Sequence, residues 1–120
     1  MISILYHLRL ISKDNSRSNK RGQFFLDPKY RKWENDVRFL TKAAYKGKPL
    51  EGDLEMHIIA FFRTKVHADC GNLSKGIADA LNKLAYNDDR QIKKMTIEVR
   101  ENWEEDAFLV EIEETKGIEK

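Results

Sequence analysis

Apolar and polar side chains alternate along four stretches of the chain, and each alternation predicts a β-strand. The stretches are residues 2–11, 53–63, 94–101 and 107–114. Successive side chains of a strand point to opposite faces, so a repeat of two residues puts the apolar ones on one face. Residues 53–63 carry apolar side chains on both faces, which predicts burial on both sides. Only residues 102–106 separate the last two strands, which therefore predict a β-hairpin.

Two further stretches carry apolar side chains at helical spacing. The first follows Asp27 and Pro28, a capping acid and a proline that favour the start of a helix. Gly47 and Pro49 predict where it ends. Its apolar stripe consists of Tyr30, Trp33, Val37, Leu40 and Ala44. Because Trp33 lies on this stripe, we expect it to belong to the core.

The second predicted helix has Asn72 as a candidate N-cap and Asn87 at its end. Its apolar stripe consists of Leu73, Ile77, Ala80, Leu81 and Leu84. A helix of this size is roughly 20 Å long. The predicted helix therefore separates Asp69, at its start, from Asp88 and Asp89, at its end. They share a site only if the preceding loop folds back or a neighbouring strand carries one group towards the other.

The order of elements is strand, helix, strand, helix, strand, strand. It predicts an α+β fold, in which a mixed four-stranded sheet packs against two helices. A length of 120 residues with 41% apolar side chains indicates a single domain over residues 1–120. No apolar run is long enough to span a membrane, and we expect no secretory signal. The single cysteine, Cys70, fits a reducing compartment, so we expect a cytoplasmic protein.

Charge is unevenly distributed along the chain. Residues 1–50 hold 12 lysines and arginines against 4 acidic residues, whereas residues 51–120 hold 10 against 16. A basic half is a plausible surface for the phosphates of a nucleic acid, although such asymmetry is also compatible with an ordinary solvated surface.

Residues 12–23 contain no apolar side chain and predict a long polar loop. Its basic side chains are Lys13, Arg17, Lys20 and Arg21. Two interpretations stay open, a mobile solvated loop and a DNA-binding loop, and both hold if the loop becomes ordered on binding.

The stretch between Asp69 and Ile92 carries a motif of residues at fixed spacing, most of them polar. In order, these residues are Asp69, Asn72, Lys75, Asp79, Leu81, Asp88, Asp89, Gln91 and Ile92. The stretch resembles the RusA-type Holliday junction resolvases, a family of crossover junction endodeoxyribonucleases. The resemblance implies a homodimeric, magnesium-dependent endonuclease that cuts four-way DNA junctions in recombination and repair. It also implies the predicted order of strands and helices.

One residue departs from the family pattern. Where the family has its second motif aspartate, which belongs to its metal-binding acidic set, this chain has Gly71. We expect position 71 to project from the same helix start as Asp69. Because glycine offers no ligand, cleavage is predicted to be weakened or absent, while the predicted fold is unaffected.

The chemistry of phosphodiester cleavage assigns roles to the remaining motif residues. Carboxylates that hold Mg2+ activate water and stabilise a charged transition state. We expect Asp69 and Asp89 to be catalytic metal ligands, with Asp88 as a further ligand. Lys75 is expected to bind the scissile phosphate or offset charge on the leaving oxygen, and Asp79 to orient Lys75.

Each role has a structural alternative. Asp69 can cap the helix, Asp88 and Asp89 can form a turn, and Lys75 can be solvated surface. Three functions follow: a magnesium-dependent junction endonuclease, a non-cleaving DNA-junction binding protein of the same fold, and a small domain whose surface acids bind a metal without a role on DNA.

Overall fold

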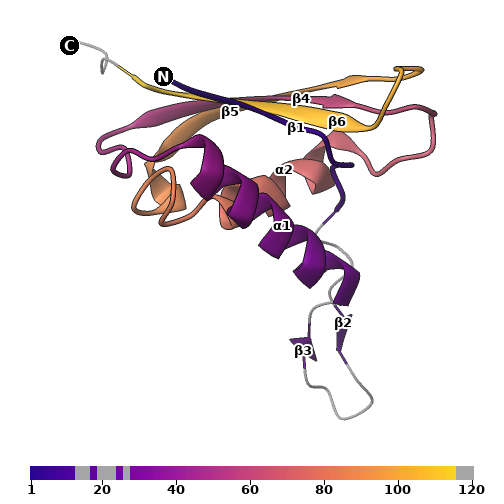
Figure 1. Ribbon diagram of the computed structural model, residues 1–120, viewed down its shortest axis with the longest axis horizontal. Coiled ribbons are helices and arrows are strands. Elements are labelled where there is room, and N and C mark those ends of the chain that lie inside the picture. Colours follow the sequence, from indigo (N-terminus) through magenta and orange to yellow (C-terminus); the bar gives the residue numbers. More distant parts are fainter. Residues whose placement is uncertain (13–16, 19–23, 26–27, 116–120) are drawn as a thin grey trace.

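A four-stranded sheet carries two helices on one of its faces (Figure 1). The computed structural model describes residues 1–12, 17–18, 24–25 and 28–115. The strands of the sheet are β1 (Ile2–Tyr6), β4 (Leu54–Phe61), β5 (Ile92–Arg100) and β6 (Ala107–Glu114), and the helices are α1 (Pro28–Ala44) and α2 (Cys70–Ala80). This mixed sheet with two helices confirms the predicted α+β fold and its order of elements.

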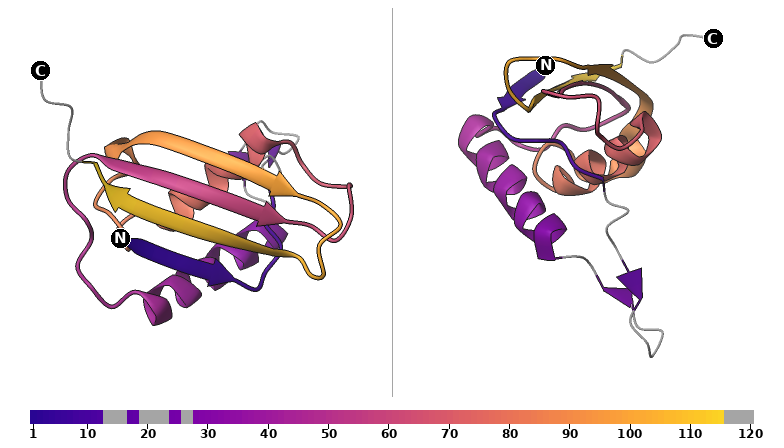
Figure 2. Two further views of the ribbon diagram at one scale, coloured as in Figure 1. Left: turned by 90° about the horizontal axis from the view of Figure 1, so that it is seen from above. Right: turned by 90° about the vertical axis from the view of Figure 1, so that its right-hand side faces the viewer.

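The strands are arranged in the order β1-β6-β4-β5. β4 pairs in parallel with β5. The connection between them contains α2, which brings the chain back to the end of the sheet where β4 begins. β6 pairs antiparallel with both β4 and β1. Figure 2 shows the four strands side by side, with the helices behind them in the left-hand view.

The predicted hairpin of the last two strands is wrong, because β5 and β6 lie on opposite sides of β4. The connection crosses the end of β4 instead. There the Phe62 N–H donates to the Arg100 carbonyl, and the Trp103 N–H donates to the Phe62 carbonyl. Asn102 has a φ of 59°, which turns the chain within this crossing.

The core lies between the sheet and the helices. From β4 it takes Leu54, Met56, Ile58 and Ala60, all fully buried. Ile59 and Phe61, on the opposite face, are only partly buried. The prediction that this strand is buried on both sides is therefore wrong for the single chain, since both helices lie on the same face of the sheet.

Helix α2 begins earlier and ends earlier than its apolar stripe predicts. Its N-cap is Asp69 rather than Asn72, and it ends at Ala80 rather than near Asn87. Lys83 has a φ of 72°, and its N–H donates to the Tyr86 carbonyl, so the chain reverses in a turn. The stripe still identifies most of the buried side chains, because Leu81 is fully buried although it lies beyond the helix, whereas Leu84 is only partly buried.

The remaining boundaries differ in smaller ways. β1 ends at Tyr6, although the alternation continues to residue 11. Helix α1 begins at Pro28, and Thr41 takes the buried position expected for Leu40. Trp33 is buried, as predicted. Asp27 lies outside the described residues. Among the helices of the described chain, none is long and apolar enough to cross a membrane.

Candidate active site

A pocket of about 490 Å³ lies between α2 and the start of β5. Its lining residues are Ser74, Lys75, Ala78, Asp79, Asp89 and Met95. Those from α2 stand one helical turn apart, so they share one face of the helix. Met95 comes from the helix-covered face of β5, where it pairs with buried Met56. The fold therefore brings a lysine and two aspartates to one pocket on the helix side of the sheet.

Asp89 reaches the pocket through a 3-10 helix, η2 (Asp89–Gln91), which follows the turn after α2. Asp88 caps this helix, since its carboxylate accepts a hydrogen bond from the Arg90 N–H at 2.9 Å. In the single chain Asp88 therefore stabilises a turn, which is the structural alternative named above. Its role as a metal ligand stays a prediction.

Gln91 holds this turn against the rest of the fold. Its Oε1 accepts hydrogen bonds from the N–H groups of Asn87 at 2.8 Å and Asp88 at 2.9 Å. Its Nε2 donates to the carbonyls of Leu50 and Gly52, both at 2.9 Å. The sequence assigned no role to Gln91 beyond its place in the motif, because the acceptors lie 39 and 41 residues away.

The two adjacent aspartates have opposite pKa shifts. Burial raises the pKa of Asp89, and the hydrogen bond to Asp88 and the negative charges of Asp88 and Asp79 raise it further. The Arg90 N–H lowers the pKa of Asp88, assisted by the hydrogen bond from Asp89. The proton that the pair retains longest therefore belongs to Asp89. A cation placed beside Asp89 would relieve the crowding of negative charge.

Asp69 does not line this pocket. It lies at the opposite end of α2, about 15 Å along the helix axis from Asp79, and its Oδ1 accepts the Asn72 N–H at 3.1 Å. Its carboxylate is thus a helix cap, the structural alternative named above, and remains exposed. Within one chain, the fold brings Asp89 to Lys75 and Asp79 but not to Asp69.

Gly71 is the second residue of α2. A Cβ atom at this position would lie 3.8 Å from Asp69 Oδ1, an ordinary van der Waals separation. Lys75 follows one helical turn later, so positions 71 and 75 are neighbours on the helix surface. A side chain at position 71 would thus stand beside the Asp69 carboxylate, on the side of the helix that leads to Lys75.

His67 is fixed close to the start of α2. Its Nδ1 lies 2.8 Å from the Ala68 carbonyl and its Nε2 lies 2.5 Å from Glu101 Oε2. The ring stacks on Phe62 with 4.4 Å between ring centroids. The hydrogen bond to the Ala68 carbonyl raises the pKa of His67, and the bond to Glu101 raises it further. These contacts give His67 a structural role beside the start of α2.

The predicted DNA-binding loop lies largely outside the described residues. This applies to Lys13, Lys20 and Arg21, and to the side chain of Arg17. The backbone of β2 (Arg17–Ser18) pairs antiparallel with that of β3 (Phe24–Phe25). This small ribbon stands away from the main sheet, beyond the start of α1 (Figures 1 and 2). The remaining predicted DNA contact, Lys75, is exposed at the pocket.

A family model described as endodeoxyribonuclease RusA matches residues 8–113, which include the pocket, the Gln91 turn and most of the sheet. No curated protein matches the chain.

Proposed function

The chain belongs to the RusA endodeoxyribonuclease family, and we propose that it is a magnesium-dependent endonuclease whose site is the pocket beside α2. The family implies nuclease activity on Holliday junctions and binding to junction DNA. The observation that carries the proposal is the meeting of Lys75, Asp79 and Asp89 at one pocket. A cation and carboxylates in one place are what phosphodiester cleavage requires.

The residues at the pocket suit magnesium. This ion prefers oxygen ligands and keeps several of its waters, so one or two carboxylates are sufficient to hold it. Asp89 is the first proposed ligand, since burial, and after it the neighbouring charges of Asp88 and Asp79, raise the pKa of this carboxylate, and a bound cation would stabilise its ionised form. Asp79 lines the same pocket and is the second candidate. Asp69 and Asp88 are the further ligands that the family resemblance and the motif favour.

When bound, the ion would polarise the phosphate and lower the pKa of its bound water. Lys75 is proposed to bind the scissile phosphate and to offset the charge that develops on the leaving oxygen. Its ammonium is well placed for this role because the side chain is exposed at the pocket. Asp79, one helical turn away, is proposed to orient Lys75.

The second candidate function is a DNA-junction binding protein that no longer cuts. Gly71 favours it, because the residue beside Asp69 provides no carboxylate. Asp69 also caps α2 at the end remote from the pocket, so one chain brings few carboxylate ligands to a metal ion there. Junction binding does not depend on that shell, since phosphate contacts from basic side chains supply most of the affinity for DNA.

The remaining parts of the proposal concern its setting. We propose a homodimer, because a four-way junction offers two strands for symmetric cleavage and a two-fold protein presents two identical sites. We also propose a role in recombination and repair in the cytoplasm. The junction-cutting activity implied by the family supports the pathway, and the lone cysteine fits a reducing compartment.

The test is cleavage of a labelled four-way junction with and without magnesium, beside a gel-shift assay with the same junction and a linear duplex. Metal-dependent cutting that Asp89→Asn or Lys75→Ala abolishes would support the nuclease. Binding to the junction without cutting would support the second candidate. Absence of preference for the junction over the duplex would contradict both.

Matched controls for these variants lie elsewhere on the surface. Asp53→Asn and Lys42→Ala change exposed residues that do not line the pocket. They should leave cutting and binding as they are in the unaltered chain. A loss of cutting in either control would show that the assay responds to charge in general rather than to the pocket.

A further inference from the structure

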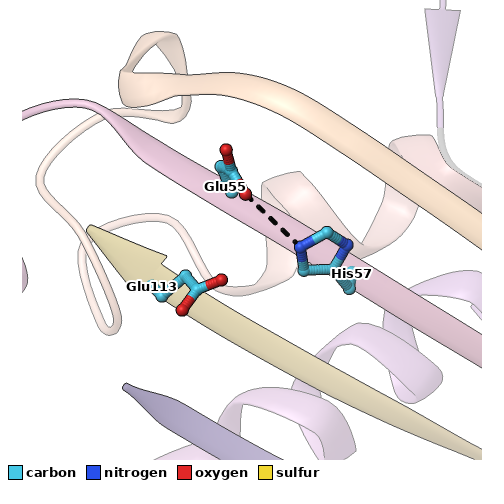
Figure 3. Close-up of side chains that lie close together, drawn as sticks. All are labelled: Glu55, His57 and Glu113. Carbon is cyan, nitrogen blue, oxygen red and sulfur yellow. Dashed lines mark ion pairs between the residues drawn. The ribbon is translucent and has the colours of Figure 1, made fainter. Parts of the chain in front are cut away.

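Three side chains of types that can ligate a metal gather on the face of the sheet opposite the helices. They are Glu55 and His57 of β4 and Glu113 of β6, and one ligand atom from each lies within 4.8 Å of the others (Figure 3). We propose that Glu55, His57 and Glu113 form a binding site for a transition-metal ion of the Zn2+ type, separate from the pocket beside α2. The proposal does not rest on the nuclease function.

Strand geometry builds the cluster. Glu55 and His57 are two residues apart on β4, so their side chains point to the same face. Glu113 lies directly opposite Glu55 in the antiparallel ladder between β4 and β6. β4 is paired on both edges, so the backbone beneath the cluster is held from both sides. A site built on such rigid strands positions its ligands more precisely than a site on loops.

The orientation of His57 is set by β5, the other strand that pairs with β4. Thr96 of β5 lies opposite His57, and its Oγ1 is 2.6 Å from Nδ1 of the ring. A neutral imidazole whose Nδ1–H donates to this hydroxyl has its lone pair on Nε2. That nitrogen faces Glu55 Oε2 at 3.5 Å (Figure 3). A second hydrogen bond of this kind is the usual support of a metal-binding histidine.

The separation of the ligand atoms matches a metal shell. Metal–ligand bonds of about 2.0–2.1 Å in a tetrahedron place neighbouring ligand atoms about 3.4 Å apart. The 3.5 Å between His57 Nε2 and Glu55 Oε2 is close to this value. Glu113 is the most exposed of the three, so a rotation of its side chain can bring its carboxylate to the same distance. Solvent can then fill the fourth position.

The charges around the cluster favour a cation. Glu55 and Glu113 face each other directly, and like charges in this arrangement destabilise a sheet. Glu111 lies opposite His57 and adds a further negative charge. Lys94 lies opposite Glu55 on the other neighbouring strand and offsets part of this excess. A mixed imidazole and carboxylate set suits zinc and its neighbours better than magnesium, which prefers oxygen alone.

The competing explanation is an ion pair without metal, in which protonated His57 serves as the cation for Glu55. Calorimetric titration of the metal-free protein with Zn2+ at pH 7.5 separates the two. We expect one zinc ion per chain at this site. Binding should be lost in His57→Gln and at least tenfold weaker in Glu113→Gln and Thr96→Val. No zinc binding, or equal binding in His57→Gln, would overturn the proposal.

Controls address the other groups that bind zinc. His7, an exposed histidine 2.9 Å from Glu105, is a matched control without the second carboxylate, so His7→Gln should bind zinc normally. Cys70→Ser removes the exposed thiol, and Asp89→Asn alters the pocket beside α2. Both should retain the site. Loss of zinc binding in any of these three variants would place the ion elsewhere and overturn the proposal.

Thermal unfolding gives a second readout that does not depend on cleavage. Because an ion bound only by the folded chain stabilises it, saturating Zn2+ should raise the melting temperature of the unaltered protein. The rise should be clearly smaller in Glu113→Gln, an exposed substitution compatible with the fold, because this variant binds the ion more weakly. An equal rise in both proteins would contradict the site.

Discussion

A side chain at Gly71 would stand next to Asp69, since its Cβ atom would lie 3.8 Å from Asp69 Oδ1. The contact is an ordinary one, and the backbone at Gly71 does not have the positive φ that strains other residues. An aspartate therefore fits at position 71 without displacing its neighbours. Two carboxylates would then stand together at the first turn of α2, where the helix dipole favours negative charge.

Gly71→Asp should restore or strengthen magnesium-dependent cleavage of a four-way junction. A second carboxylate beside Asp69 supplies an oxygen ligand that glycine lacks, so at sub-saturating magnesium we expect at least about a tenfold gain in rate, equivalent to ~1.4 kcal/mol. Junction binding measured without metal should not become tighter, because the added charge repels phosphate.

Gly71→Asn is the matched control for size, since it offers an amide in place of the carboxylate and should give little of the gain. If the unaltered protein cuts as fast as Gly71→Asp at sub-saturating magnesium, position 71 does not contribute a ligand. Asp79 or Asp88 would then have to complete the metal shell.

Asp89→Asn should stabilise the folded chain at pH 7. The folded-state pKa of Asp89 is raised above its ordinary value of 3.8, so the ionised carboxylate is disfavoured in the fold. This penalty is absent below the unfolded pKa and complete above the raised folded pKa. Urea denaturation should therefore give Asp89→Asn a higher free energy of unfolding at pH 7, and the difference should vanish near pH 3.

Asp88→Asn is the opposite case and serves as the control. The pKa of Asp88 is lowered in the fold, so its charge stabilises the folded state above the unfolded pKa and ceases to do so as the pH falls. This variant should be less stable than the unaltered chain at pH 7. Destabilisation by both substitutions would show that lost hydrogen bonds outweigh the charge effect.

Gln91→Ala should destabilise the fold by at least about 2 kcal/mol, because it removes four hydrogen bonds that each contribute about 0.5–1.5 kcal/mol. It also frees the turn that holds Asp89, so cleavage should fall with stability. Gln91→Glu keeps the acceptor for the Asn87 and Asp88 N–H groups but loses the donor to the Leu50 and Gly52 carbonyls. Its stability should therefore lie between that of Gln91→Ala and that of the unaltered chain. A cost below ~0.5 kcal/mol in urea denaturation would show that solvent replaces these bonds.

Binding to junction DNA should weaken steeply as the salt concentration rises, because we expect the basic side chains of the loop around β2 to contact phosphates. Each phosphate contact from lysine or arginine contributes about 0.9 to the slope of log affinity against log salt. Replacing Arg17, Lys20 and Arg21 with alanine should lower that slope by up to about 3. The exposed Lys46 and Lys48, beyond the other end of α1, provide a control pair. An unchanged slope in the loop variant would exclude this loop from the DNA interface.

The protein should be a dimer in solution. Partly exposed apolar side chains on the outer face of the sheet, such as Leu5 and its pairing partner Leu109, are compatible with contact to a second copy. Light scattering at tens of micromolar should give twice the 14.1 kDa mass of the chain. A mass equal to that of one chain would count against the proposed two-fold arrangement on the junction.

Periodicity in the sequence determined the order of the helices and strands and most of the side chains that they bury. The last strand occupies Ala107–Glu114, as its alternation predicts, and the stripe of α2 buries Leu73, Ile77 and Ala80. These features are local, because the repeat of a strand or helix decides which side chains share a face. The motif from Asp69 to Ile92 likewise indicated a family that the match over residues 8–113 confirms.

The tertiary structure alone decided how these elements meet. β6 lies between β1 and β4 instead of pairing with β5, because strand pairing depends on backbone partners far away in the chain. The pocket brings Asp89 to Lys75 and Asp79, and leaves Asp69 as a cap, because the chain turns at Lys83 and Gln91 ties that turn to Leu50 and Gly52. Such bonds join residues that no local repeat relates, so only the folded chain reveals them.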